Sequence, residues 1–453
     1  MRPLSLTIFL LLLFGSAASA DYRQKAEEQT DYIQTHFYDA AAKRYRPAYP
    51  VDPKSLPFDF MWGNGVEFSA LVGAARNDPA KYKPLLYEFR EGLQTYWDPK
   101  APVPGFNAYC SGPGGTDKYY DDNEWLVLGF ADAYETTHDP LFLRDAKRTQ
   151  RFVLSGWDDK LGGGIYWKVD HKSKNTCSNG PAAASALRLY QVARQEDQMA
   201  WAVKIRDWTN AHLLDSDGLY WDNVNLEGRI GKAKFSYNTA LMIRTDVLLF
   251  QLRHDASALT EARRLADAGL AAWTDPATGS LQKTEGSPRF THLFCEALLR
   301  LYDVTKDTKY LNAVRREAGY AYLHVRDPDG GYWDHWNERE HKPDERKSLI
   351  ENASVARLFW LLAPYPDPEQ LLDDGVKAAG SGQDARAEAL LRQSADSQFV
   401  AVDARYRLWK ILTREKMTGD AAAESAVLTD YAKDPSLFIR LKAIGWQESI
   451  TPH

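Results

Sequence analysis

Two adjacent carboxylates are the residues of this chain best suited to chemistry. Asp121 and Asp122 stand in the segment Tyr119-Tyr-Asp-Asp-Asn-Glu-Trp125, flanked by aromatic residues at the predicted start of a helix. Two carboxyl groups in one cleft repel each other and lose solvation, so their pKa values move apart and one can act as an acid while the other acts as a nucleophile. Glycoside hydrolysis uses such a pair, about 5–5.5 Å apart for retention of configuration and about 6.5–9.5 Å apart for inversion.

The same segment also fits a purely structural role. Asp121 with Glu124 matches a capping box, and acidic side chains suit the N-terminus of a helix. A cap needs only one carboxylate, however, and this segment carries two side by side. Neighbours at a helix start can splay to the shorter of the two separations, so a catalytic pair here favours retention.

The elements that would position this pair repeat six times. Asp-containing turns, usually with a glycine and an aromatic residue, begin at residues 39, 98, 158, 215, 275 and 327, at spacings of 59, 60, 57, 60 and 52 residues. A period near 60 residues is too long for the common helical repeats but accommodates two helices and two loops. The sequence therefore predicts an all-α fold, an (α/α)6 toroid of six helix hairpins whose loops gather around one concave face.

Each predicted hairpin joins a polar-faced outer helix to a more apolar inner helix rich in small residues. The outer helices are predicted over residues 22–37, 80–97, 141–157, 198–213, 258–273 and 309–325. The inner helices are predicted over residues 65–76, 123–135, 180–194, 239–252, 292–304 and 353–362. Four inner helices end at a short turn in which an aspartate is expected to N-cap the next outer helix, at Asp78, Asp139, Asp255 and Asp307.

The two ends of the chain differ from the repeats. Residues 1–20 read as a signal peptide cleaved after Ala20, because Arg2 precedes an apolar run that ends in Ala18-Ser-Ala20. The mature chain is therefore expected to be secreted or periplasmic, with a catalytic domain over residues 21–366. Residues 367–453 are predicted to form a helical C-terminal extension, which would pack on the barrel or offer a surface for self-association.

Composition excludes several classes of partner. The formal charge is −6, and it becomes −7 once Arg2 is removed, which argues against nucleic acid or an anionic membrane as a partner. No metal-type spacing, HExxH motif or phosphate loop occurs, so no metal or organic cofactor is expected. The three cysteines allow at most one disulfide, and a Cys110–Cys177 bridge stays open. Most of the 14 tryptophans and 24 tyrosines should pack between helices, while some on loops could stack on sugar rings.

Three stretches resemble a known family. The segment Asp121-Asp-Asn-Glu-Trp125, after two tyrosines, is similar to the twin-aspartate motif of glycoside hydrolase family 76, the endo-α-1,6-mannanases. The stretches at 162–180 and 237–243 agree with it, and the resemblance runs from about residue 22 to 365. It implies that Asp121 is the nucleophile and Asp122 the acid/base of a retaining double displacement on α-mannan polysaccharide or oligosaccharide. The C-terminal extension departs from the family pattern, as does Cys177, where the motif often has an aliphatic residue.

Further residues are expected on the rim that follows from the repeats. Asparagines at inner-helix starts could bond sugar hydroxyls, although N-capping is the competing role. Trp125 is expected in the core, Glu67 could tune the charge of the cavity or make a plain buried polar contact, and His292 either touches substrate or is structural. The predicted substrate-binding residues are Trp62, Asn64, Tyr120, Asn123, Tyr166, Trp167, Asn179, Tyr237, Asn238 and Trp333.

Other functions compete with this interpretation, because the toroid also hosts inverting glycosidases, lyases and epimerases. An epimerase should carry catalytic histidines on its inner helices, where only His292 is suitably placed. A lyase acting on uronates needs a basic cleft, and the rim motifs here contain aspartate and asparagine. A non-catalytic glycan-binding protein would have lost the acid pair, which this sequence retains.

Overall fold

The computed structural model describes residues 21–110, 117–336, 341, 345–395 and 400–433. The chain divides into two compact units, of which the larger spans Tyr22–Tyr365 and the other contains the residues from Pro366 onward. The expected signal peptide at residues 1–20 lies outside the described residues, so it stays a prediction.

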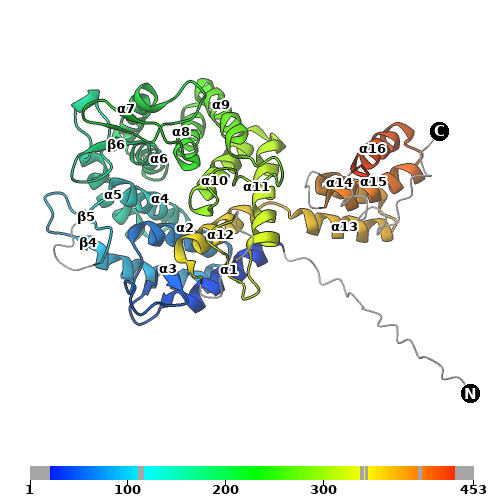
Figure 1. Cartoon of the computed structure of the whole chain (residues 1–453), viewed down its shortest axis with the longest axis horizontal. Helices are drawn as coiled ribbons and strands as arrows, with labels where there is room; N and C mark the ends of the chain where they lie inside the picture. The colour runs from blue at the N-terminus through cyan, green and yellow to red at the C-terminus, as the bar shows by residue number, and fades with distance from the viewer. Residues whose placement is uncertain (1–20, 111–116, 337–340, 342–344, 396–399, 434–453) are drawn as a thin grey trace, which may run out of the picture. The chain divides into compact units, whose positions relative to one another are not determined.

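Six helices form a closed inner ring in the larger unit, because each packs on the next and the last packs on the first. They are α2 (Met61–Asn77), α4 (Tyr120–Thr137), α6 (Thr176–Ala193), α8 (Ser236–Arg253), α10 (Pro288–Thr305) and α12 (Leu349–Leu362) (Figure 1). Small residues let these helices approach closely. A Cβ on Gly180 of α6, for example, would lie 2.9 Å from the Cβ of Leu241 on α8. This is the inner ring that the small-residue runs predict.

Six outer helices cover the inner ring, each packed on one inner helix. They are α1 (Tyr22–His36), α3 (Pro79–Leu93), α5 (Pro140–Ser155), α7 (Glu196–Leu213), α9 (Ala256–Trp273) and α11 (Thr308–Tyr320). Helix α1 packs on α12, so the two ends of the repeat series meet and close the toroid. The predicted (α/α)6 fold is confirmed. The predicted caps are confirmed too, because the carboxylates of Asp78, Asp139, Asp255 and Asp307 accept backbone N–H groups of the helices that follow them.

Every inner helix begins three or four residues earlier than the sequence predicts. Helix α4, for example, begins at Tyr120 and not at Asn123. The polar residues that resemble caps therefore lie inside the first helical turn. The residue that precedes α4 is Tyr119, in extended conformation, and it makes no side-chain capping bond.

The loops before the inner helices carry short strands that tie neighbouring repeats together. Strand β6 (Ser173–Asn175) pairs with β7 (Asn223–Asn225), which pairs with β8 (Ile230–Gly231). Strand β3 (Ala48–Tyr49) pairs with β9 (Lys347–Ser348), so the first and last repeats are also joined at their loops. Two hairpins complete the set, β1 (Tyr38–Asp39) with β2 (Arg44–Tyr45) and β4 (Trp97–Asp98) with β5 (Gly105–Phe106).

The second unit is a separate helical assembly. Its helices are α13 (Pro368–Gly380), α14 (Asp384–Ser394), α15 (Ala401–Arg414) and α16 (Thr418–Tyr431), each packed on the next. They enclose their own apolar core, which includes Ala387, Leu391, Leu408, Leu412 and Leu428. Across the described residues of both units, no helix combines the length and the apolar character needed to cross a membrane.

Candidate active site

The acid pair lies in the first turn of α4, where the loop face of the ring begins. Asp121 and Asp122 are the second and third residues of this helix. Neither they nor Glu124 form the expected capping box, because Tyr119 precedes the helix and no side chain caps it. The helix therefore positions these carboxylates, and neither of them serves as a cap. They remain available at the helix N-terminus, where the helix dipole favours negative charge.

Asp121 is held in place by three donors. Its Oδ2 accepts the indole Nε1–H of Trp167 at 3.0 Å, and its Oδ1 accepts the backbone N–H of Asp122 at 2.9 Å. The thiol of Cys177 also hydrogen-bonds to this carboxylate. Burial raises the pKa of Asp121 to about 6, although these hydrogen bonds oppose the increase by favouring the ionised form. Asp121 therefore changes its charge close to neutral pH.

Asp122 is more buried than its neighbour, with 9% of its surface exposed. Burial raises its pKa well above the usual range, and the charges of Asp121 and Asp59 raise it further. Glu124, two residues beyond the pair, is fully buried and its pKa is raised in the same way. No lysine or arginine of the described chain forms an ion pair with any of these groups. When Asp121 ionises, Asp122 therefore keeps its proton.

A cleft with about 810 Å³ of open space lies against Asp121. Three of the predicted binding residues, Trp62, Trp167 and Tyr237, line it. Phe290 packs between Trp62 and Tyr237, with ring centroids 5.6 Å and 4.9 Å away, which fixes both rings at the cleft. Trp125, expected in the core, is only partly buried and also lines the cleft. The cleft thus places flat aromatic rings around a carboxylate.

Sequence reasoning missed several polar residues of the cleft, which are Ser173, Asn175, Asp222 and Asn223, together with Phe235. The pairing of β6 with β7 brings them together, since Asn175 lies opposite Asn223. Asp222 is a further carboxylate whose pKa is raised by burial, while hydrogen bonds from Asn223 and Asn238 oppose that increase. The available signal was the turn itself, because Asp222 directly follows Gly218-Leu-Tyr-Trp221, which matches Gly164-Ile-Tyr-Trp167 of the preceding repeat.

Two of the predicted sugar-binding asparagines fasten the inner helices to their own loops. Asn123 Oδ1 accepts the N–H of Phe106 at 2.8 Å, and its Nδ2 donates to the carbonyls of Phe106 and Tyr119. Asn179 makes the same set of bonds with Ile165 and Asn175. Their amides are fully buried and their hydrogen-bonding groups are occupied by the backbone, which leaves none of them exposed to the cleft.

Asn64 has a related structural role. It is fully buried, and its Nδ2 donates to the carbonyls of Asp59 and Phe60 and to the hydroxyl of Tyr96. Asn238 is also fully buried and hydrogen-bonds to Asp222, so it can influence the cleft only through that carboxylate. The expectation that both contact sugar directly is not supported by their burial.

Two predicted tyrosines lie in the core for a similar reason. Tyr120 stacks on Phe152 with ring centroids 4.9 Å apart. Tyr166 is fully buried, stacks on His171 at 4.2 Å and donates its hydroxyl to Asp158 at 2.7 Å. Neither ring lines the cleft, although Asp121 and Trp167, the residues that follow them in the chain, do so.

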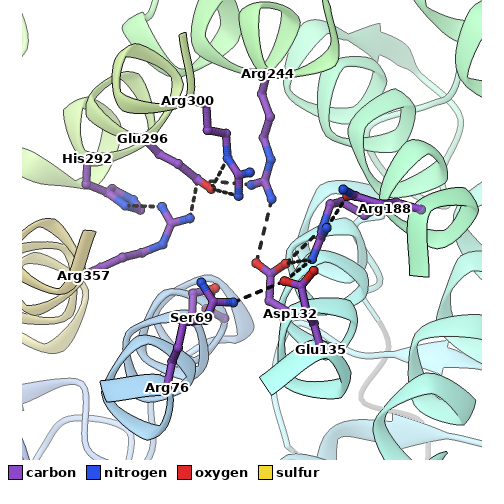
Figure 2. A network of polar contacts seen from close by, with 12 residues as sticks. Ser69, Arg76, Asp132, Glu135, Arg188, Arg244, His292, Glu296, Arg300 and Arg357 are labelled. Carbon is purple, nitrogen blue, oxygen red and sulfur yellow. Dashed lines mark hydrogen bonds and ion pairs between the residues drawn. The ribbon is translucent and has the colours of Figure 1, made fainter. Parts of the chain in front are cut away.

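The remaining candidates are tied to other parts of the ring. Trp333 is part-buried, stacks on His341 at 4.3 Å and carries Lys347 Nζ over its ring, so it does not join the residues that line the cleft. Glu67 is fully buried, so it does not face the cavity, and its Oε1 lies 3.5 Å from Gln34 Nε2. Burial raises the pKa of Glu67 to about 8. His292 is buried against Arg357 in a polar network on the axis of the ring (Figure 2).

One of the three cysteines, Cys177, lines the cleft. All three cysteines are free thiols, so the Cys110–Cys177 bridge does not form. Burial raises the pKa of Cys177 well above its usual range, so this thiol serves Asp121 as a neutral donor. Within the described ranges, no group of three or more histidine, cysteine, aspartate or glutamate side chains could hold a metal ion.

The arrangement is suited to acid–base chemistry on a ring-shaped polar substrate. One carboxylate that ionises near neutral pH stands beside another that keeps its proton, which is the division of roles that a nucleophile and an acid require. Aromatic faces and amide groups around them can stack on apolar ring faces and bond hydroxyls.

Comparisons with known proteins point to one family. The profile described as "Glycosyl hydrolase family 76" matches residues 22–298. A GH76 α-mannanase from Bacteroides thetaiotaomicron has a TM-score of 0.71 and 26% identity, over 76% of this chain and 96% of that one. An inactive α-1,6-mannanase variant from Salegentibacter sp. HEL1_6, with two adjacent aspartates replaced by asparagine and α-1,6-mannotriose bound, has a TM-score of 0.66 and 25% identity, over 76% and 99% of the two chains.

Curated relatives match over shorter stretches. A mannan endo-1,6-α-mannosidase of Candida glabrata is 30% identical over 109 residues, which is 21% of this chain and 24% of that protein. The chain spans at most about half the length of the curated relatives it matches.

Proposed function

Because this chain belongs to glycosyl hydrolase family 76, we propose that it hydrolyses α-mannosidic linkages with retention of configuration. The observation that carries this proposal is the pair Asp121 and Asp122, two adjacent carboxyl groups of unequal proton affinity beside an aromatic cleft. The similarity to an α-1,6-mannanase whose variant at two adjacent aspartates is inactive supports the same pair.

Asp121 acts as the nucleophile in this proposal, because its carboxylate is the one of the pair that ionises first. It attacks the anomeric carbon while Asp122 gives its proton to the glycosidic oxygen, so the bond to the leaving sugar breaks and a glycosyl–Asp121 ester forms. Asp122, now ionised, takes a proton from water. The water oxygen bonds to the anomeric carbon, Asp121 leaves as a carboxylate and Asp122 is again protonated.

The residues that line the cleft indicate which substrate it can bind. Trp62, Trp167 and Tyr237 offer rings for stacking, while Asp222 and Asn223 offer groups for sugar hydroxyls. We propose α-1,6-mannan or its oligosaccharides as the substrate and cleavage within the chain as the mode of action, in line with the names of the relatives. We also propose that the protein acts outside the cytoplasm after loss of residues 1–20, with the C-terminal extension as a surface for self-association.

The test is hydrolysis of α-1,6-mannan and of α-1,6-mannooligosaccharides by the wild type, Asp121→Asn and Asp122→Asn. Asp159→Asn is the matched control, since it changes an exposed aspartate in the loop after α5. We expect an α-anomeric first product by NMR, a mixture of product lengths, and a rate at least about 10³-fold lower in both site variants. Turnover that survives either site change would place the chemistry on other residues.

Reaction with azide distinguishes the nucleophile from the acid/base. With an activated α-mannoside, Asp121→Ala plus azide should yield the β-azide by direct displacement. Asp122→Ala plus azide should yield the α-azide, because the glycosyl ester still forms and azide then replaces it. The opposite products would exchange the roles, and binding of mannan without any hydrolysis by the wild type would identify a glycan-binding protein.

A further inference from the structure

A second, narrow pocket lies on the axis of the ring, beneath the cleft. Trp125 lines both spaces, so it separates the cleft from this axial pocket. The polar residues of the axial pocket are Ser69, Asp132, Arg244, His292 and Arg357, contributed by five of the six inner helices. There is room for only a few atoms, about the size of a water molecule or a chloride ion.

Arg244 presents unused donors to this pocket. Its side chain is 3% exposed, and its Nη1 donates to Glu296 Oε2 at 3.1 Å. Its Nη2 approaches Asp132 Oδ2 only to 3.9 Å, and neither Nη2 nor Nε makes a hydrogen bond within the described part of the chain. Burial lowers the pKa of Arg244 to about 9, even though Glu296 favours its charged form. This guanidinium is therefore incompletely compensated.

His292 adds a third unused donor, and its tautomer follows from its neighbour. A guanidinium can only donate, so Arg357 Nη1 donates to His292 Nδ1 across the 2.9 Å between them. Burial and the charge of Arg357 hold the pKa of His292 well below its usual range, although Glu296 and a backbone hydrogen bond with Arg289 oppose this shift, so the ring is neutral. Because Nδ1 accepts from Arg357, the ring proton is on Nε2. This Nε2–H is buried and has no acceptor among the described residues.

The buried charge around the pocket does not balance. Five guanidinium groups face three carboxylates in this network, which leaves an excess of two positive charges (Figure 2); the cations are Arg76, Arg188, Arg244, Arg300 and Arg357, and the anions are Asp132, Glu135 and Glu296. Arg76 and Glu135 lie near the surface, where the side chain of each is about half exposed. A buried cation that lacks a counter-charge is costly, so an anion is favoured here over a neutral water molecule.

We propose that the axial pocket binds a chloride-sized monovalent anion, held by the Nε–H and Nη2–H of Arg244 and the Nε2–H of His292. All three groups are donors, which suits an acceptor with no proton of its own. The bound anion offsets the excess charge of the inner ring and supports Trp125 from below. The site is thus an internal anion site, separate from the place where sugar binds.

Bromide tests the site directly in the mature wild-type protein. Crystals grown without halide and soaked in sodium bromide should show an anomalous peak between Arg244 and His292. In solution, the Tm should rise by a few degrees and saturate as chloride replaces gluconate at constant ionic strength. An absent peak, together with equal responses to chloride and gluconate, would overturn the proposal without any variant.

Two variants sharpen the test. Arg244→Gln removes the donors and should lose both the bromide peak and the saturable rise in Tm. Arg188→Gln is the matched control, because Arg188 binds Asp132 and Glu135 but does not line the pocket, so its halide response should persist. A saturable halide response that survives in Arg244→Gln would also contradict the proposed site.

Discussion

Helix α4 carries an aspartate toward each end, and the pKa values of these two residues are shifted in opposite directions. Asp121 and Asp132 lie 11 residues apart on one face of the helix, a rise of about 16 Å. Asp121 meets neutral donors, and its pKa is raised by burial. Burial would raise the pKa of Asp132 as well, but Arg188, Arg244 and Arg300 lower it below the usual range.

The difference teaches how one ring supports both chemistry and stability. At the cleft end, Asp121, Asp122 and Glu124 are buried without an ion-pair partner, which keeps a proton available near neutral pH and costs stability. At the opposite end, carboxylates are held ionised by arginines. Glu296 is the clearest case, because Arg244, Arg357 and Arg300 together hold its pKa well below its usual range despite its burial.

The largest expected effects come from neutralising the cleft end. Asp121→Asn should lower activity at least about 10³-fold and at the same time stabilise the fold. The folded-state pKa of Asp121 is raised, so this group favours folding at low pH, and that contribution is lost as the pH rises from about 4 through about 6. The variant should therefore match the wild type near pH 4 and exceed it by about 1–2 kcal/mol at pH 8, measured by urea unfolding. Equal stability at pH 8 would contradict the unpaired state of Asp121.

Neutralising the opposite end should have the reverse effect. Glu296→Gln leaves the buried Arg244 and Arg357 and the part-buried Arg300 without their shared carboxylate, so we expect a loss of about 3–5 kcal/mol in the free energy of unfolding. Glu135→Gln is the control, because that carboxylate is about half exposed and should cost about 1 kcal/mol or less. If the two variants prove equally stable, the buried network does not hold the ring together.

The sequence predicts the ring better than the rim. Period and polarity identified twelve helices, because burial on an inner helix demands small and apolar residues along its whole length. The roles of Asn123 and Asn179 do not follow from the sequence, since an asparagine in a first turn looks the same whether it faces a sugar or fastens a loop. Asp222 and Asn223 were missed because a strand pair, β6 with β7, brings them to the cleft, and two-residue and three-residue strands leave no periodic signal.

The free energy of unfolding and KM distinguish an asparagine that fastens a helix to its loop, Asn123, from one that lines the cleft, Asn223. Asn123→Ala leaves the buried N–H of Phe106 without its acceptor and should cost about 2–3 kcal/mol, with an unchanged KM for mannooligosaccharides. Asn223→Ala should instead leave the free energy of unfolding within about 0.5 kcal/mol and raise KM roughly tenfold. A raised KM in a fully stable Asn123→Ala would restore that residue to the binding site.

The smallest expected effect isolates one hydrogen bond at the cleft. Trp167→Phe keeps a ring at the cleft but removes the 3.0 Å donor to Asp121, a contact worth about 1 kcal/mol because Trp167 is 39% exposed. That bond favours the ionised carboxylate, so its loss should raise the pKa of Asp121 by less than about one unit. The acidic limb of the pH–rate profile should then move upward, with kcat reduced a few-fold near pH 5 and little changed near pH 8. Trp333→Phe, in the sixth repeat, should leave that limb in place, and an equal shift in both variants would show that the effect does not pass through Asp121.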